Sequence, residues 1–231
     1  MPMNIAVLGD IHFPFHSEEA LNWALDIIKR GNFSHVIQCG DLVDFYSLSR
    51  FSKSQNSIRM TPLEEIESAR DLSVKMWENI KKVSPRSKCI QLTGNHDIRL
   101  KSSILNSLPE LLGLVDLSYL FKFKGVKTIH SDKEEFVLND ICFMHGYRSK
   151  LGDHCKHNLM CTVCGHSHRG GVFHMKLQNE MPLWELNVGF LADQKSAALS
   201  YQKQRWVPWT LGMGIVDDLG PRFVPFPGIK K

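Results

Sequence analysis

The chain has 231 residues, of which 43% are hydrophobic and 23% charged, as is ordinary for a soluble globular protein with a substantial core. The formal charge of +4 permits an anionic substrate but does not demonstrate one. The first apolar run, residues 5–8, is too short for a signal peptide core or a membrane span. We expect one domain over residues 1–231, cytoplasmic and not membrane-associated, with its six cysteines as reduced thiols.

The first part of the chain alternates between predicted strands and helices. Apolar runs at residues 4–8, 35–39 and 88–92 predict buried strands. A helix is predicted after the N-cap Ser17, with basic residues in its last turn and Gly31 as its stop. Strand, helix, strand in this order is typical of an α/β layered fold.

A longer amphipathic helix is predicted between the second and third strands. It begins at Thr61-Pro62-Leu63-Glu64, which combines an N-cap, a proline in the first turn and a capping-box glutamate. Leu63 is expected on its apolar face, and Pro85 marks its end. The polar residues 45–60 in front of it are interpreted as a surface loop with one short helical turn.

Shorter elements are predicted in the remainder of the chain. Residues 97–120 are expected to be helical in two pieces. Strand-like runs follow at residues 126–129, 135–138, 141–144, 160–164, 172–177, 183–188 and 211–216. Residues 172–231 are assigned to strands of a second sheet and, because of Pro221, Pro225 and Pro227, to an irregular C-terminus.

Five of the predicted strands end in similar polar residues. These ends are Asp10-Ile11-His12, Gly40-Asp41-Leu42-Val43-Asp44, Gly94-Asn95-His96-Asp97, His145-Gly146 and Gly165-His166-Ser167-His168. Any one of them by itself is more often a turn, but their recurrence predicts a shared site, because sites of α/β folds gather at the carboxyl ends of strands. Imidazole mixed with carboxylate suits Mn, Fe, Zn or Co better than Ca, and indicates two divalent cations.

The order and spacing of these motifs, from Asp10 to His168, resemble those of the calcineurin-like metallophosphoesterase family. The resemblance implies an α/β fold in which two mixed β-sheets form a sandwich flanked by helices. It also implies a hydrolase acting on ester bonds, in which a hydroxide bridging two metal ions attacks a phosphate ester. Mn is the first candidate metal, with Fe, Zn, Co, Ni and Mg as alternatives.

The resemblance also implies a role for each residue of the motifs. The implied metal ligands are Asp10, His12 and His168 for the first ion, Asn95, His145 and His166 for the second, and Asp41 as the bridge. His96 is expected to protonate the leaving-group oxygen, and Asp44 to orient His96. Asp97 is expected to cap the helix that follows.

Two departures from the family's protein phosphatases bear on the substrate. Those enzymes carry an arginine after the second motif and usually a glutamate at the end of the third, where this chain has Phe45 and Asp97. We therefore predict a phosphodiesterase or nuclease acting on nucleotides or short nucleic acids. The alternative is a phosphomonoesterase acting on nucleoside monophosphates or other small phosphomonoesters. A protein phosphatase and a non-catalytic scaffold rank behind both.

Three features stay open at the level of sequence. Arg99, Arg148 and Arg169 follow ligand motifs and serve equally well as substrate contacts or as solvated surface charges. Residues 201–209 interleave basic and aromatic side chains, which suits either a nucleic-acid loop or the edge of the second sheet. A zinc site formed by Cys161 and Cys164 with Cys155, His154 and His157 is disfavoured. Residues three apart in a strand face opposite sides, and the histidines fit a polar surface helix.

Overall fold

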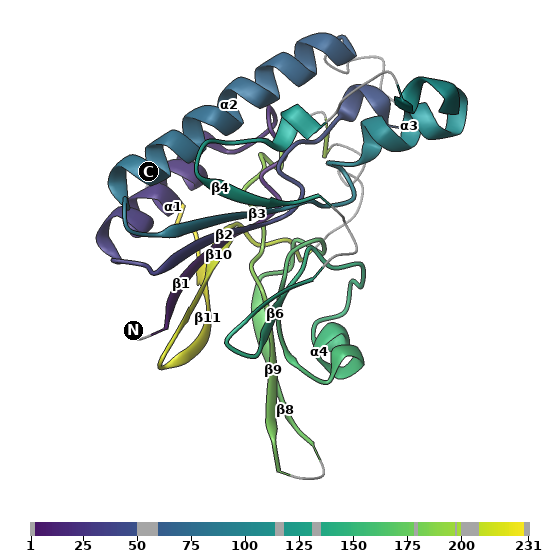
Figure 1. The fold of residues 1–231 in the computed structure, drawn as a ribbon. Helices are drawn as coiled ribbons and strands as arrows, with labels where there is room; N and C mark the ends of the chain where they lie inside the picture. Colours follow the sequence, from purple (N-terminus) through teal and green to yellow (C-terminus); the bar gives the residue numbers. More distant parts are fainter. Residues whose placement is uncertain are drawn as a thin grey trace.

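The computed structural model describes residues 3–49, 60–113, 118–130, 135–177, 180–196, 198–199 and 208–228 (Figure 1). The strands of the first sheet are β1 (Asn4–Leu8), β2 (His35–Cys39), β3 (Lys88–Leu92), β4 (Val126–Ile129), β10 (Gly212–Asp217) and β11 (Gly220–Pro225). The strands of the second sheet are β5 (Phe136–Leu138), β6 (Ile141–Phe143), β7 (Cys161–Cys164), β8 (Gly171–Lys176) and β9 (Pro182–Asn187). The helices are α1 (Glu18–Arg30), α2 (Pro62–Val83), α3 (Arg99–Ser107) and α4 (Asp153–Asn158), with 3-10 turns η1 (Tyr46–Leu48), η2 (Pro109–Gly113) and η3 (Ser118–Phe121).

Both sheets are mixed, so the predicted α/β class with two mixed sheets is confirmed. The first has the order β11-β10-β1-β2-β3-β4, in which β1 to β4 run parallel and β10 pairs antiparallel with β1. The second has the order β5-β6-β7-β9-β8, with parallel β6, β7 and β9 between antiparallel edge strands. Within the described residues, no helix has the length and apolar character needed to cross a membrane.

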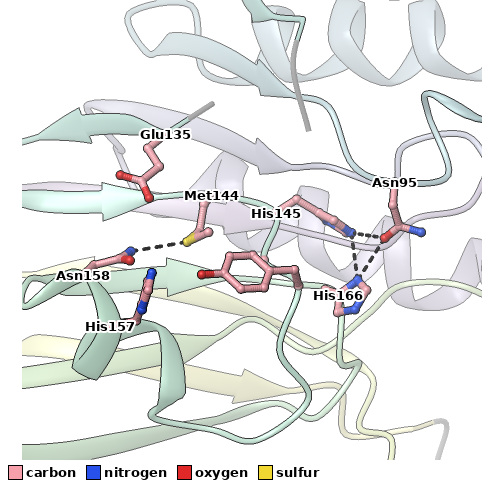
Figure 2. A pocket seen from close by; sticks show the side chains of 9 residues that line it. Asn95, Glu135, Met144, His145, His157, Asn158 and His166 are labelled. Atoms are coloured by element: carbon pink, nitrogen blue, oxygen red, sulfur yellow. Dashed lines mark hydrogen bonds between the residues drawn. The ribbon is translucent and has the colours of Figure 1, made fainter. Parts of the chain in front are cut away.

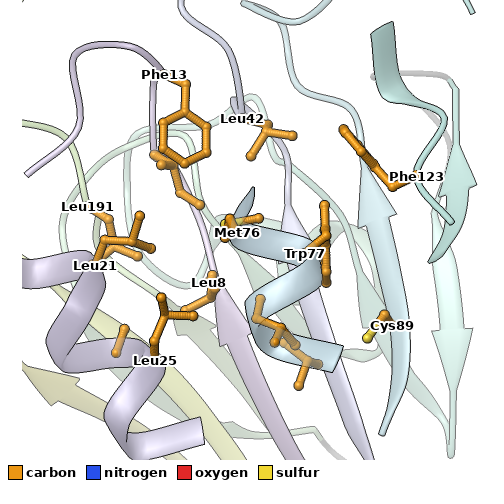
Figure 3. Packing of buried hydrophobic residues seen from close by; sticks show 14 of the residues in the cluster. Leu8, Phe13, Leu21, Leu25, Leu42, Met76, Trp77, Cys89, Phe123 and Leu191 are labelled. Carbon is orange, nitrogen blue, oxygen red and sulfur yellow. The ribbon is translucent and has the colours of Figure 1, made fainter. Parts of the chain in front are cut away.

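The central strands β1, β2 and β3 of the first sheet are mainly apolar and almost fully buried, because both faces of the sheet are covered there. On β1, Ile5 and Val7 point into a core shared with the second sheet, where they join Phe143. Leu8 points to the opposite face, where α1 and α2 cover the sheet (Figure 1). Figure 3 shows Leu8 between the side chains of α1 and those of α2, among them Trp77. These two cores hold the first sheet between helices and the second sheet, as expected for the sandwich.

The predicted helix boundaries are confirmed for α1 and α2. Ser17 caps α1, and Thr61 caps α2 in a complete capping box with Glu64. The predicted position of Leu63 on the apolar face is wrong, since its side chain is 63% exposed. Instead Glu65 is buried, and its carboxylate accepts hydrogen bonds from the backbone amides of η1. Polar contacts with the neighbouring loop therefore set the orientation of the first turn of α2.

Replacing Thr61 with alanine is expected to lower the free energy of unfolding by about 1 kcal/mol. The Thr61 hydroxyl accepts from the Glu64 amide, and the Glu64 carboxylate accepts from the Thr61 amide at 2.8 Å, so the substitution removes one half of a reciprocal pair. Urea denaturation measures the change. Serine at the same position keeps the hydroxyl and serves as the control, and an equal loss in both variants would contradict the capping explanation.

The prediction for the C-terminal segment needs two corrections. First, β10 and β11 belong to the first sheet, where β10 pairs with β1, and not to the second. Second, residues 220–225 form a regular strand instead of irregular chain. Pro221 and Pro225 are compatible with this strand because β11 lies at the edge of its sheet. An edge strand pairs on one side only, so the N–H that proline lacks can face away from the neighbouring strand.

Candidate metal centre and active site

The predicted ligands come together because their strands are parallel neighbours. Asp10, Asp41 and Asn95 follow β1, β2 and β3, whose carboxyl ends lie side by side in the first sheet. His145 and His166 follow β6 and β7, which are adjacent and parallel in the second sheet. The two sheets pack face to face, so the two sets of loops meet at one end of the sandwich.

The backbone at these strand ends is unusual. Among the predicted ligands, positive φ angles occur at Asp10 (51°), His12 (56°), Asp41 (52°), His166 (67°) and His168 (58°). Such backbone conformations cost residues with a Cβ about 1–3 kcal/mol, and therefore persist only where the surrounding structure enforces them. Their concentration at the strand ends indicates that the chain is shaped here for a site.

The first group of predicted ligands is buried. His168 Nε2 lies 3.2 Å from Asp10 Oδ1 and 3.3 Å from His12 Nε2. His12 Nε2 lies 3.9 Å from a carboxylate oxygen of Asp10 and 3.9 Å from one of Asp41. Ring nitrogens and carboxylate oxygens of this group thus lie close together, as the ligands of a metal ion do.

The second group lies on the other side of Asp41. Asn95 Oδ1 is 3.0 Å from His145 Nε2 and 2.9 Å from His166 Nδ1, and Figure 2 shows the three side chains pointing toward one another. Asp41 Oδ2 is 3.2 Å from His145 Nε2, so this carboxylate reaches both groups. Asp41 is therefore close to donor atoms of both groups.

Backbone amides hold the two central carboxylates. The His166 amide donates to both oxygens of Asp10, at 3.1 and 2.9 Å, and the His96 amide donates to Asp41 Oδ1 at 2.8 Å. Glycine is required beside each carboxylate: a Cβ on Gly165 would lie 2.3 Å from Asp10 Oδ2, and one on Gly94 would lie 2.2 Å from Asp41 Oδ1. The glycines of these motifs therefore allow the backbone to approach the carboxylates.

The electrostatics of the cluster favour cations. Burial by itself would raise the pKa of Asp41, but the neighbouring His145 and His96 rings outweigh it and hold this pKa well below its ordinary value. The pKa of Asp10 is likewise lowered: burial would raise it, and His168 more than offsets that effect. Ionised carboxylates buried together are costly without a compensating charge. Carboxylate, imidazole and amide oxygen in this arrangement fit two divalent metal ions.

Asp44 has a closer partner than the sequence predicts. Its Oδ2 lies 3.4 Å from His96 Nδ1, the expected partner, but only 2.8 Å from Nδ1 of His12. Burial would raise the pKa of Asp44, but the hydrogen bond with His12 and the nearby His96 ring lower it. One buried carboxylate thus hydrogen-bonds with a predicted metal ligand and lies close to the predicted general acid.

Arg99 is the predicted substrate arginine that the structure brings to this cluster. Its guanidinium donates to the carbonyl oxygen of Asp44 at 3.0 Å, to Asp44 Oδ1 at 3.3 Å and to His96 Nε2 at 2.8 Å. Because Nε2 of His96 accepts this hydrogen bond, the neutral ring carries its proton on Nδ1, facing Asp44. Arg99 therefore places a positive charge next to His96 although Phe45 occupies the position of the missing arginine.

The prediction that Asp97 caps the following helix is wrong. The N-cap of α3 is Ile98, which makes no side-chain capping bond. Asp97 is buried, and its carboxylate accepts from the amides of Gly94 at 2.7 Å and Val43 at 2.8 Å. Burial and the nearby charge of Asp41 raise the pKa of Asp97 to about 7. This side chain links the turns after β2 and β3, and is thereby unavailable to the helix.

The other two predicted arginines contact the surroundings of the cluster. The Arg148 guanidinium lies 5.1 Å from the centre of the Tyr147 ring, and exposed Arg169 donates to the carbonyl oxygen of Ser149 at 3.5 Å. Residues 200–207, most of the predicted basic and aromatic stretch, lie outside the described residues. Trp209, the last residue of that stretch, packs edge-on against His168 with ring centroids 4.7 Å apart.

The prediction of a polar surface environment for His154 is also wrong, because its side chain is buried. His154 Nε2 accepts from the amides of Tyr147 and Arg148, both at 3.1 Å, and its Nδ1 lies 3.5 Å from Glu185 Oε1. Cys164 Sγ is 3.7 Å from the same Nδ1. Sequence reasoning missed Glu185, because a single glutamate within an apolar strand gives no sign that it faces the interior.

The Glu185 carboxylate accepts hydrogen bonds from backbone amides at the start of α4. Its oxygens accept from the amides of Gly152 at 2.9 Å, His154 at 2.8 Å and Cys155 at 3.0 Å. Glu185 and His154 are thus engaged in hydrogen bonds that support the loop after β6. That loop carries His145, so the network supports a predicted metal ligand from behind.

Paired clusters of histidine, carboxylate and amide side chains that share one carboxylate are typical of hydrolases with two metal ions. Residues 3–170 match the model of the calcineurin-like phosphoesterase family. The chain belongs to this family, whose members are dinuclear metal-dependent hydrolases of phosphate esters.

Similar proteins are found in phages and among solved structures. The chain is 26% identical to the Gene 54 protein of Mycobacterium phage L5, covering 99% of this chain and 95% of that protein. It is 25% identical to the Gene 54 protein of Mycobacterium phage D29, with the same coverage. Among solved structures, the phosphoesterase Yfce from E. coli is 13% identical, with a TM-score of 0.46 and 94% and 89% of the two chains covered. A dimetal phosphatase from Danio rerio is 10% identical, with a TM-score of 0.44 and 94% and 93% covered.

Proposed function

We propose that the protein hydrolyses phosphodiester bonds of nucleotides or short nucleic acids. The observation that carries this proposal is a pair of cavities that share Asn95. One, of about 500 Å³, extends along His145 and Tyr147, and the other, of about 340 Å³, extends along Arg99 and Ser102. A phosphodiester carries an organic group on each of two ester oxygens, whereas a monoester carries one. Space in two cavities that meet at Asn95 therefore favours a diester.

Each predicted residue has a task in this reaction. Asp10, His12 and His168 would hold one metal ion, Asn95, His145 and His166 the other, and Asp41 both. Two such ions, of which Mn is the first candidate, would polarise the phosphoryl oxygens and lower the pKa of a water. The burial of Asp10, His12, Asp41, His145 and His168 and the lowered pKa values of the two aspartates support the assignment.

His96 and Arg99 act on the leaving group and the phosphate. His96 Nε2 faces the cluster, 3.8 Å from Asp41 Oδ2. When Arg99 turns to the phosphate and the ring is protonated on both nitrogens, Nε2 can pass its proton to the leaving oxygen. Asp44 Oδ2 lies 3.4 Å from the other ring nitrogen, and its negative charge stabilises the protonated ring. The Arg99 guanidinium can exchange its hydrogen bond with His96 for one to a phosphoryl oxygen, which a planar donor pair suits well.

The test compares bis(p-nitrophenyl) phosphate with p-nitrophenyl phosphate, both with added Mn²⁺. The diester is expected to show the higher kcat/KM, because its second aryl group can enter the second cavity. A marked preference for the monoester would replace this proposal with the alternative, a phosphomonoesterase acting on nucleoside monophosphates. A panel of nucleotides and oligonucleotides then defines the natural leaving group, and repeating the assay with Fe, Zn, Co, Ni and Mg tests the choice of metal.

A further inference from the structure

The larger of the two cavities has two chemically different ends. Asn95, His145 and His166, three predicted metal ligands, form one end. Figure 2 shows Glu135, His157 and Asn158 at the opposite end, with Met144 between. A group attached to a phosphate at the metal centre would therefore extend through an apolar section and finish against polar side chains.

The apolar section contains an aromatic ring held in place. Tyr147 lines the cavity, and its residue is 56% exposed, so ring surface is available to a ligand. Its amide donates to His154 Nε2 at 3.1 Å, and the His154 ring meets the tyrosine ring edge-on with centroids 5.2 Å apart. Because Glu185 in turn holds His154, the position of this backbone is set before a ligand arrives.

The polar end offers hydrogen-bonding groups with weak internal partners. The Asn158 amide nitrogen donates to Met144 Sδ at 3.6 Å and to Cys142 Sγ at 3.7 Å, and sulfur is a weak acceptor. An oxygen or ring nitrogen of a ligand would be a stronger partner for this amide. Glu135, exposed at the same end, supplies a carboxylate acceptor, and His157 a ring that can donate or accept.

We propose that this cavity is a nucleoside-binding subsite, in which the base stacks on Tyr147 and its edge hydrogen-bonds with Asn158 and Glu135. A phosphate at one end, an aromatic surface in the middle and mixed donors and acceptors at the far end match the order of groups in a nucleotide. The inference rests on the proposed function, since it takes the phosphate to lie at the metal centre. It adds which part of the substrate this side of the centre recognises.

The test measures binding of adenosine and uridine 5′-monophosphate and of ribose 5-phosphate to the Mn²⁺-loaded protein by calorimetry. The nucleotides are expected to bind more tightly than ribose 5-phosphate, which lacks the base. Tyr147→Ala should weaken nucleotide binding about tenfold and leave ribose 5-phosphate binding unchanged. Tyr119→Ala, at an exposed tyrosine that does not line the cavity, is the matched control. Asn158→Leu should change the preference between the two bases.

Equal affinity of the wild-type protein for nucleotides and ribose 5-phosphate would overturn the subsite, as would an equal loss for both ligands in Tyr147→Ala. Failure of the subsite can be distinguished from failure of the proposed function. If bis(p-nitrophenyl) phosphate is hydrolysed while the base adds no affinity, only the subsite is wrong. If the base adds affinity while no phosphate diester is hydrolysed, the proposed reaction is wrong and the subsite remains.

Discussion

Replacing His96 with alanine is expected to lower turnover by about 10²–10⁴-fold while metal content stays near that of the wild type. The ring contacts Arg99 and Asp44 and is not among the predicted ligands. The loss should be larger for a dinucleotide, whose leaving alkoxide needs a proton, than for bis(p-nitrophenyl) phosphate, whose leaving phenolate does not. Steady-state kinetics on both substrates, with metal analysis of the purified variant, measure the two effects.

His130→Ala, at an exposed histidine outside the cluster, controls for the loss of an imidazole. Loss of metal in His96→Ala would contradict the assigned role. The outcome is informative because donor atoms of His96, His12 and Asp41 lie within 4.8 Å of one another, so the geometry also permits His96 as a ligand. An equal loss on both substrates would keep His96 in the site but remove its role as proton donor.

Replacing Asp44 with asparagine is expected to lower metal affinity by about 10–100-fold, in addition to lowering turnover. Asp44 Oδ2 accepts from His12 Nδ1 at 2.8 Å, so the carboxylate fixes which nitrogen of His12 faces the metal and makes it a better donor. Asparagine keeps the shape but removes the charge. Titration of the metal-free protein with Mn²⁺ measures affinity, and kcat at saturating metal isolates the effect on His96.

The control for Asp44→Asn is Asp26→Asn, at an exposed carboxylate on α1 that pairs with Arg30. Unchanged metal affinity with reduced turnover would mean that Asp44 serves His96 alone, as the sequence predicts. Reduced affinity with an unchanged kcat at saturating metal would mean that it serves His12 alone. The distances of 2.8 and 3.4 Å lead us to expect both effects, the one on His12 being the more direct.

Local patterns were sufficient for much of the fold. The strands 4–8, 35–39 and 88–92 were predicted to the residue, because burial of both faces leaves mainly apolar runs with sharp polar ends. The caps at Ser17 and Thr61 were equally clear, since capping depends on residues three positions apart. Pro221 and Pro225 led to the wrong prediction of an irregular segment. A strand at the edge of a sheet tolerates proline, but an edge position cannot be recognised from sequence.

By itself, the sequence determined the family and the set of residues predicted to hold metal, since the ligand motifs are short and each directly follows a strand. Only the tertiary structure decided how these residues are supported. Asp44 meets His12 across 32 positions, Arg99 meets Asp44 across 55, and Glu185 meets the amide of His154 across 31. Such contacts depend on which strand ends lie side by side and which way each loop turns, and no local pattern in the chain encodes either.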